Sequence, residues 1–197
     1  MVDQKVFMKK AVFTVIVDNY RPDICAQTIP TIKAYADKIG ADHIIISERK
    51  FPEWPATYEK MQIFELGKDY DHCLLIDADM VVAENAPDFT HGILPGFVGV
   101  LEAFNADTLF EKDEYFVKDG RNIGLASNLV LTDKETHRLW EPLEMTWEEA
   151  RKKTEREFII DEYCLSRNLA KYGFKFTGLN YNDDVMKLFS HLGVTTT

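Results

Sequence analysis

The sequence predicts an α/β protein with a central, mostly parallel sheet flanked by helices. Short apolar runs over residues 11–17 and 73–76 have the composition of strands buried on both faces, and residues 43–47 form a further apolar run that predicts a strand. Two segments with helical patterns separate these runs. Strands and helices that alternate at this spacing predict parallel strands joined by right-handed crossovers.

A proline, a glycine or a polar turn bounds each element of the first half. In order, we expect a strand over 11–17, a helix that follows Pro22, is interrupted or restarted at Pro30 and stops at Gly40, a strand over 43–47, a helix from about 56 to 66 closed by Gly67, and the strand that begins at Cys73. Ligands of parallel sheets bind at the carboxyl ends of the strands, where Asp18 and Asp77 lie.

The second half is less regular, and capping boxes and glycine stops mark its elements. We expect strands over 96–101, 125–131 and 174–177, a helix begun by the capping box at Thr132 and ended by Pro142, a charged helix begun by the box at Thr146, and a helix over 158–171 stopped by Gly173. No internal repeat and no linker-like composition divides the chain. We therefore expect residues 1–197 to form a single domain, whole or excised from a longer polypeptide.

The bulk composition excludes several classes of protein. With 197 residues, 46% of them apolar, the chain is long enough for a substantial core. Its formal charge of −10 argues against a nucleic-acid or anionic-membrane surface, which needs many Lys and Arg side chains. The three cysteines are widely spaced and form no CxxC pair, which favours buried free thiols in a reducing compartment. Without a transmembrane-length segment or a convincing signal peptide, we expect a soluble, cytoplasmic protein.

Two carboxylates, those of Asp77 and Asp79, follow the apolar run that begins at Cys73. Side chains alternate along a strand, so we expect both carboxylates to lean to the same side and Ala78 to point away. Unpaired carboxylates are expensive to bury, whereas two hard oxygen ligands at the mouth of a strand suit a divalent cation and the phosphates it binds. A second Asp-x-Asp triplet, at residues 69–71, has polar flanks and is expected on a surface turn.

The segments YEKMQIFEL (58–66), YD (70–71) and LLIDADMVV (74–82) resemble the core of nucleotide-sugar-dependent glycosyltransferases of the GT-A fold. The most similar type is the glycogenin and bacterial galactosyltransferase family, in which a helix with a Tyr/Thr-x-Lys element precedes the strand that delivers an Asp-x-Asp motif. The whole string also resembles chlorovirus capsid glycosyltransferases. The resemblance implies a GT-A fold with a Rossmann-like nucleotide-binding half.

This resemblance implies a metal site and roles for the matching residues. Asp77 and Asp79 would hold Mn²⁺ or Mg²⁺ between the two phosphates of a nucleotide-sugar. His191 is similar to the late histidine that completes the metal shell in that family, although Gly193 follows it by two residues where the family has three. Lys60 would neutralise phosphate or contact the sugar.

The carboxyl end of the first strand is the expected nucleoside cradle, and a later helix is the expected acceptor side. The nucleotide-sugar-binding residues that we expect are Thr14, Val17, Asn19, Tyr20, Arg21, Lys60, Asp77, Ala78 and Asn128. Asp161 and Glu162 stand where the family has an Asp-Gln pair beside the sugar. A carboxylate there would act as general base on an acceptor hydroxyl or steady the developing oxocarbenium charge.

These expectations describe a metal-dependent glycosyltransferase that moves a sugar from a nucleotide-diphosphate donor, such as a UDP-sugar, to a glycan or glycoprotein acceptor. A haloacid dehalogenase-like phosphatase would use the same residues with Asp77 as nucleophile, but its motif lies on the first core strand. Sugar nucleotidyltransferases share the architecture, yet the Gly-rich phosphate loop is missing here. A non-catalytic nucleotide- or sugar-binding module is the remaining alternative.

Overall fold

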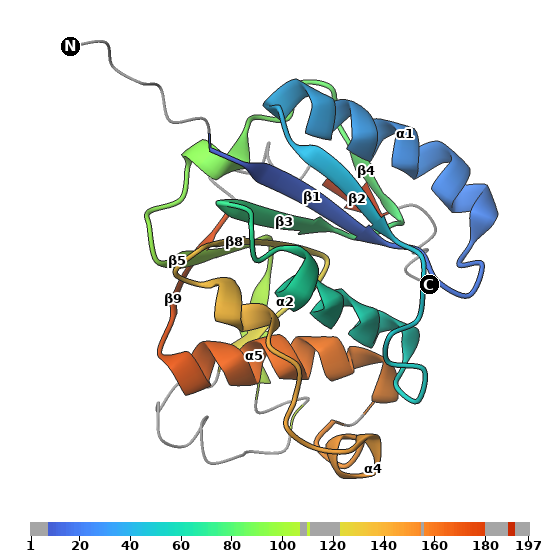
Figure 1. Ribbon diagram of the computed structural model, residues 1–197, viewed down its shortest axis with the longest axis vertical. Helices are drawn as coiled ribbons and strands as arrows, with labels where there is room; N and C mark the ends of the chain where they lie inside the picture. Colours follow the sequence, from blue (N-terminus) through green and yellow to red (C-terminus); the bar gives the residue numbers. More distant parts are fainter. Residues whose placement is uncertain (1–7, 107–109, 111–122, 155, 180–188, 192–197) are drawn as a thin grey trace.

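The computed structural model describes residues 8–106, 110, 123–154, 156–179 and 189–191, and all structural statements below concern these residues. A six-stranded sheet crosses the molecule in the order β2-β1-β3-β8-β5-β9 (Figure 1). Its strands are β1 (Lys10–Val15), β2 (Asp42–Ile46), β3 (His72–Ile76), β8 (Leu129–Asp133), β5 (Phe97–Val100) and β9 (Lys175–Gly178). Neighbours pair in parallel except around β8, which is antiparallel to both β3 and β5. The expected mostly parallel sheet is confirmed.

Helices cover both faces of this sheet, each over its own apolar cluster (Figure 1). On one face α1 (Pro22–Ile39) packs Ile32 and Ala36 against side chains such as Leu74. On the other face α5 (Ile160–Tyr172), the 3₁₀ helix η1 (Ala56–Gln62) and the short α2 (Ile63–Leu66) pack against side chains such as Leu75. Burial of these two apolar faces is the main stabilising contribution to such a layered fold.

The first half of the chain matches its expected elements closely. The stop at Gly40 is confirmed, because this residue adopts the left-handed conformation (φ 68°) that ends α1. The expected interruption at Pro30 is wrong, since α1 runs through it without a break. Buried residues on both sides of Pro30, among them Thr28 and Ile32, pack on the sheet and outweigh the local cost of the missing backbone donor.

The second half departs from expectation in two places. The strand expected over 125–131 is split into β7 (Ile123–Leu125) and β8 by residues 126–128. The capping box at Thr132 begins no helix, because β8 continues to Asp133 and only a 3₁₀ turn, η4 (His137–Trp140), follows. The Thr132 hydroxyl instead accepts the indole N–H of Trp140 at 2.8 Å in the core.

The remaining elements are short. They are β4 (Met80–Val82), which pairs antiparallel with β10 (Phe189–His191), β6 (Ala103–Asn105), which pairs antiparallel with β7, the 3₁₀ helices η2 (Phe89–His91) and η5 (Glu157–Ile159), and α4 (Trp147–Ala150). The capping box of Thr146 and Glu149 forms as expected. The three cysteines are free and buried. In the part of the chain that is described, no helix is both long and apolar enough to cross a membrane.

Candidate active site

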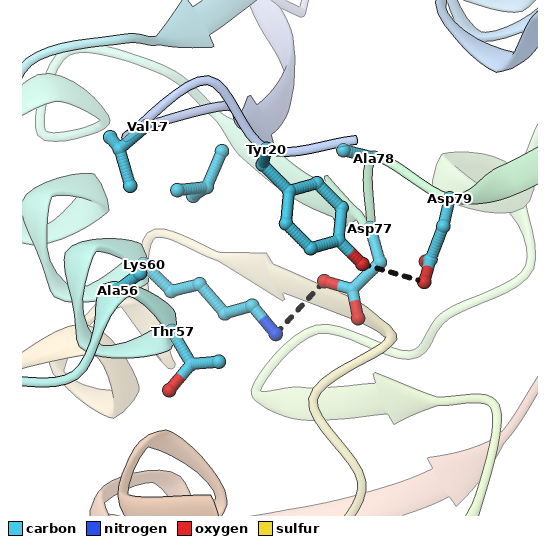
Figure 2. Close-up of a pocket in the computed structure, with 9 residues that line it drawn as sticks. Val17, Tyr20, Ala56, Thr57, Lys60, Asp77, Ala78 and Asp79 are labelled. Atoms are coloured by element: carbon cyan, nitrogen blue, oxygen red, sulfur yellow. Dashed lines mark hydrogen bonds and ion pairs between the residues drawn. The ribbon is translucent and has the colours of Figure 1, made fainter. Parts of the chain in front are cut away.

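A cleft opens at the carboxyl ends of β1 and β3, where ligands of parallel sheets bind (Figure 2). It contains about 510 Å³ of empty space, counting its open mouth. Three segments line it: the end of β1 and the turn after it, the start of η1, and the link between β3 and β4. The lining residues are Val15, Val17, Tyr20, Ala56, Thr57, Lys60, Asp77, Ala78 and Asp79.

The two aspartates lie in a tight turn between β3 and β4 rather than in a strand. The N–H of Met80 donates to the carbonyl of Asp77 at 3.1 Å, and the N–H of Asp77 donates to the carbonyl of Asn128 at 2.9 Å. Because the chain turns, Ala78 lines the cleft together with both aspartates, and the expected strand-like alternation is wrong. The hydroxyl of Thr28 on α1 donates to the carbonyl of Ala78 and holds the turn from behind.

Lys60 is the cation that the described residues place among the carboxylates of the cleft. Its Nζ lies 2.8 Å from Oδ1 of Asp77 and 3.0 Å from Oδ2 of Asp161 (Figure 2 shows the contact with Asp77). Burial lowers the pKa of Lys60, but the charges of Asp161 and Asp77 outweigh it, so the pKa lies above its ordinary value. The ammonium group therefore stays charged although only 6% of the side chain is exposed.

Ser127, in the break between β7 and β8, joins this cation to the start of α5. Its Oγ accepts a hydrogen bond from Lys60 at 2.9 Å and donates one to Asp161 at 2.7 Å, while its backbone N–H donates to Oε1 of Glu162 at 3.4 Å. Asp161 is fully buried, and Glu162 is partly exposed. Burial, followed by the charge of Asp161, raises the pKa of Glu162 to about 7.

Among the described residues, the carboxyl groups in and beside the cleft outnumber the cations. Burial, partly offset by Lys60, raises the pKa of Asp77 to about 6. Asp79 in the cleft and Glu162 beside it contribute two further carboxyl groups, and Lys60 is the ammonium group that the described residues place among them. Carboxylate oxygens in excess of the nearby cation are the donor set that a hard divalent ion prefers, so these residues fit such an ion.

Tyr20 reaches into the cleft from the turn after β1. Its hydroxyl donates to Oδ2 of Asp79 at 3.0 Å (Figure 2). Burial and then Asp79 raise the pKa of Tyr20 to about 12, so that it remains a donor at neutral pH. Three neighbours, Asp18, Asn19 and Arg21, have positive φ angles of 54°, 55° and 33°. Such angles are costly for side chains with a Cβ, and they cluster at functional sites.

Most of the expected site residues come together here, but two of them, Thr14 and Asn128, do not line the cleft. The structure brings Val17, Tyr20, Lys60, Asp77, Ala78 and Asp79 into the cleft and Asp161 and Glu162 beside it, with Asn19 and Arg21 exposed on the adjoining turn. Thr14 lies fully buried with Oγ1 3.3 Å from Nε2 of His43, so its side chain does not line the cleft. The side chain of Asn128 accepts its neighbour's N–H, from Leu129, at 2.8 Å.

His191 can be placed only by its backbone. In the β10–β4 ladder it pairs with Met80, the residue after Asp79, so the chain passes beside the aspartate turn. The position of its side chain lies outside the described residues. Among those residues, no group of three His, Cys, Asp or Glu side chains is arranged to hold a metal ion.

Sequence reasoning missed the central role of Ser127. Ala126-Ser127-Asn128 partly resembles a strand element of the glycosyltransferase family, and this resemblance predicted Asn128 as the sugar contact. The side chain that touches Lys60 and Asp161 is that of Ser127. A small polar residue between two apolar strands was the available signal.

Comparison with known proteins identifies the fold. No protein-family model matches the chain, and no curated protein matches its sequence. Among solved structures, a glycosyltransferase involved in the glycosylation of the major capsid of PBCV-1 aligns with a TM-score of 0.56 at 13% identity, covering 95% of this chain and 94% of that one.

Two further structures agree. A mutant of Drosophila beta-1,4-galactosyltransferase 7, in complex with manganese, UDP-Gal and xylobiose, aligns with a TM-score of 0.54 at 14% identity, covering 93% of this chain and 71% of that one. The bifunctional glycosyltransferase WbbM, in its apo form, aligns with a TM-score of 0.52 at 15% identity over 88% of this chain and 39% of that one. The chain therefore has the GT-A fold of these glycosyltransferases.

Proposed function

We propose that this protein is a metal-dependent glycosyltransferase that transfers a sugar from a nucleotide-diphosphate donor, a UDP-sugar, to a hydroxyl group of a glycan or glycoprotein acceptor. The observation that supports this most strongly is the pair Asp77 and Asp79, which faces a cleft at the carboxyl ends of β1 and β3 beside the buried ammonium of Lys60. The shared GT-A fold is consistent with it.

The donor diphosphate would lie at the aspartate turn. Asp77 and Asp79 would hold Mn²⁺ or Mg²⁺, and His191 is the proposed third ligand. Oxygen and imidazole donors suit such an ion, and manganese accompanies UDP-Gal in the galactosyltransferase 7 complex. A divalent ion held by these residues would supply positive charge to a departing diphosphate. Lys60 adds a fixed positive charge on the same side of the cleft.

The nucleoside would occupy the part of the cleft next to β1. Val15 and Val17 give it an apolar wall, and the ring of Tyr20 stands beside them (Figure 2). A mostly apolar cleft with a few directed polar groups is the usual form of a small-molecule site. Asn19 and Arg21, on the same turn, are the proposed polar contacts at its exposed edge.

The two carboxylates at the start of α5 would have different roles, Asp161 in positioning and Glu162 in proton transfer. Asp161 is held by Lys60 and Ser127, so it fixes the position of the ammonium group. Glu162 has one long hydrogen bond, to Ser127, and a pKa near 7, which suits a general base. We assign to Glu162 the role of accepting the proton of the acceptor hydroxyl. The acceptor oxygen bonds to the anomeric carbon as the bond from that carbon to the diphosphate breaks and the nucleoside diphosphate leaves with the electron pair. Asn128 remains a proposed sugar contact.

Thermal unfolding with UDP and Mn²⁺ tests this function. Ligands that bind only the folded state raise its melting temperature. We expect UDP with Mn²⁺ to raise the Tm of the wild-type protein, and Asp79→Ala to lose this increase. The matched control is Asp69→Ala, at the exposed first residue of the triplet at residues 69–71, which should respond as the wild type does.

Other results would contradict the proposal. Turnover of p-nitrophenyl phosphate that disappears in Asp77→Asn would identify a phosphatase with an aspartate nucleophile. An unchanged Tm with UDP and Mn²⁺, together with no turnover of a phosphate ester, would leave a binding module with another ligand.

A further inference from the structure

Arg49 lies in the loop after β2, outside the lining of the cleft, yet it contacts both of the cleft's sides. Its Nε donates to Oε1 of Glu59 on η1 at 2.8 Å, and its Nη1 pairs with the carboxylate of Asp18 in the turn after β1. Its Nη2 donates to the carbonyl of Phe51 at 3.2 Å and to that of Trp54. The guanidinium group therefore bonds to three segments that are separate in the sequence.

Glu59 anchors Arg49 on the side of η1. Its side chain is fully buried and accepts the backbone N–H groups of Lys50 and Phe51, each at 2.9 Å, and the amide of Gln62 at 2.7 Å. A buried carboxylate is tolerated when hydrogen bonds and a cation compensate it, and here Arg49 is that cation. The residue after Glu59 is Lys60, so this anchor also holds the segment that delivers the ammonium group to the cleft.

Asp18 is the contact on the other side. It is the first left-handed residue of the turn after β1, and it lies between Val17 and Tyr20, both of which line the cleft. Its side chain is 57% exposed, and residues 19–21 are exposed as well, so these turn residues have little burial of their own to hold them. The ion pair with Arg49 ties this strained turn to η1.

We propose that Arg49 is a positioning residue that sets the width of the nucleotide cleft, by fixing the turn that bears Tyr20 relative to the helix that bears Lys60. A lysine cannot replace it, because a single ammonium group cannot direct bonds to Asp18, Glu59 and the loop carbonyls together. The identity of the ligand as a nucleotide diphosphate rests on the proposed function. The restraint that Arg49 places on the turn after β1 does not depend on that function.

The first test needs no ligand. Amide hydrogen exchange at residues 17–21 should be about tenfold faster in Arg49→Lys than in the wild type, because the turn loses its tie. Arg138→Lys is the matched control, since Arg138 is 59% exposed and pairs with Glu141, and neither residue lines the cleft. It should leave the exchange at residues 17–21 unchanged. Unchanged exchange in Arg49→Lys would overturn the proposal.

The second test measures ligands by titration calorimetry. In Arg49→Lys, affinity for UDP at saturating Mn²⁺ should fall about tenfold, because small misplacements of a binding wall are costly. Affinity for Mn²⁺ alone should stay as in the wild type, since Asp77 and Asp79 do not touch Arg49. A general loosening of the protein would weaken both ligands, and that result would overturn the positioning role.

Further variants keep the two proposals separable. Arg49→Met leaves the buried carboxylate of Glu59 without its cation, so this variant is the one that would misfold most readily. Asp18→Asn is therefore the second variant that breaks the same ion pair. Its side chain is exposed, and asparagine adopts positive φ angles readily. It should raise exchange at residues 17–21 as Arg49→Lys does. Wild-type protein that binds no UDP contradicts the proposed function, whereas equal UDP affinity in the wild type and Arg49→Lys contradicts the role of Arg49.

Discussion

The Nζ atom of Lys60 lies 2.8 Å from Oδ1 of Asp77 and 3.0 Å from Oδ2 of Asp161, which makes one buried ammonium group the junction between the turn after β3 and the first turn of α5. Neither carboxylate has another cation within contact distance among the described residues. The stability of the molecule and the charge of its cleft thus depend on the same side chain.

Replacing Lys60 by Met should lower the free energy of unfolding by about 3 kcal/mol or more, because it removes the cation from the buried carboxylate of Asp161 and from the partly exposed carboxylate of Asp77. Without the cation the pKa of Asp77 rises further, so the loss should be largest at pH 8 and smaller near pH 5. Urea unfolding at both pH values measures this. Lys33→Met, which breaks an exposed pair with Asp37, is the control and should cost less than about 0.5 kcal/mol. Equal losses in both variants would contradict the prediction.

Tyr20→Phe should weaken Mn²⁺ binding about tenfold, as the loss of a hydrogen bond to a metal ligand typically does. The hydroxyl of Tyr20 orients the carboxylate of Asp79, and the phenyl ring keeps the packing. Paramagnetic resonance of free Mn²⁺ gives the affinity. Tyr172→Phe removes a comparable hydroxyl that donates to Glu141, and it should have no effect. Wild-type affinity in Tyr20→Phe would show that the hydroxyl plays no part in the site.

The rate of transfer should rise with pH through about 7 and level off above it, because Glu162 accepts a proton only when ionised and its pKa is about 7. Glu162→Gln should reduce kcat about a hundredfold or more and remove this rise. Glu157→Gln, on the exposed turn before α5, is the matched control and should keep the wild-type profile. A Glu162→Gln profile that still rises near pH 7 would assign the base to another group.

Glu162 should also make stability depend on pH. Its pKa in the folded protein, about 7, exceeds its ordinary value of 4.5, so the folded state holds the proton more tightly than the unfolded state does. The stability gained from this proton is complete below pH 4.5 and is lost as the pH rises through 7. Glu162→Gln keeps an oxygen that can accept the N–H of Ser127 and carries no charge.

We therefore expect Glu162→Gln to be about 1 kcal/mol more stable than the wild type at pH 8.5, after allowance for partial exposure, and equally stable at about pH 4, below the ordinary pKa of the group. The midpoint of urea unfolding at the two pH values measures the difference. A gain of the same size at both values would mean that ionisation of Glu162 is not its cause.

Local sequence patterns correctly predicted those features that depend only on residues nearby in the chain, such as the ends of helices. Gly40 and Gly173 both end their helices in the left-handed conformation, as the sequence predicts. The capping box at Thr132 failed, because β8 pairs with β3 in a register that places Asp133 opposite His72, and this pairing takes Thr132 into the core. Strand pairing is decided by partners distant in the sequence, which a local pattern does not contain.

By itself the sequence determined the order of strands and helices in the first half and the position of the Asp-x-Asp pair after an apolar strand. Hydrophobic periodicity and the residues that end helices are local properties of the chain, so they can be recognised without the fold. Tertiary structure alone decided what surrounds that pair. Insertion of β8 between β3 and β5 brings Ser127 to Lys60, and packing of α5 brings Asp161 to the same ammonium group. The charge balance of the cleft depends on these distances, since the interaction of charges is set by their separation and burial in the fold.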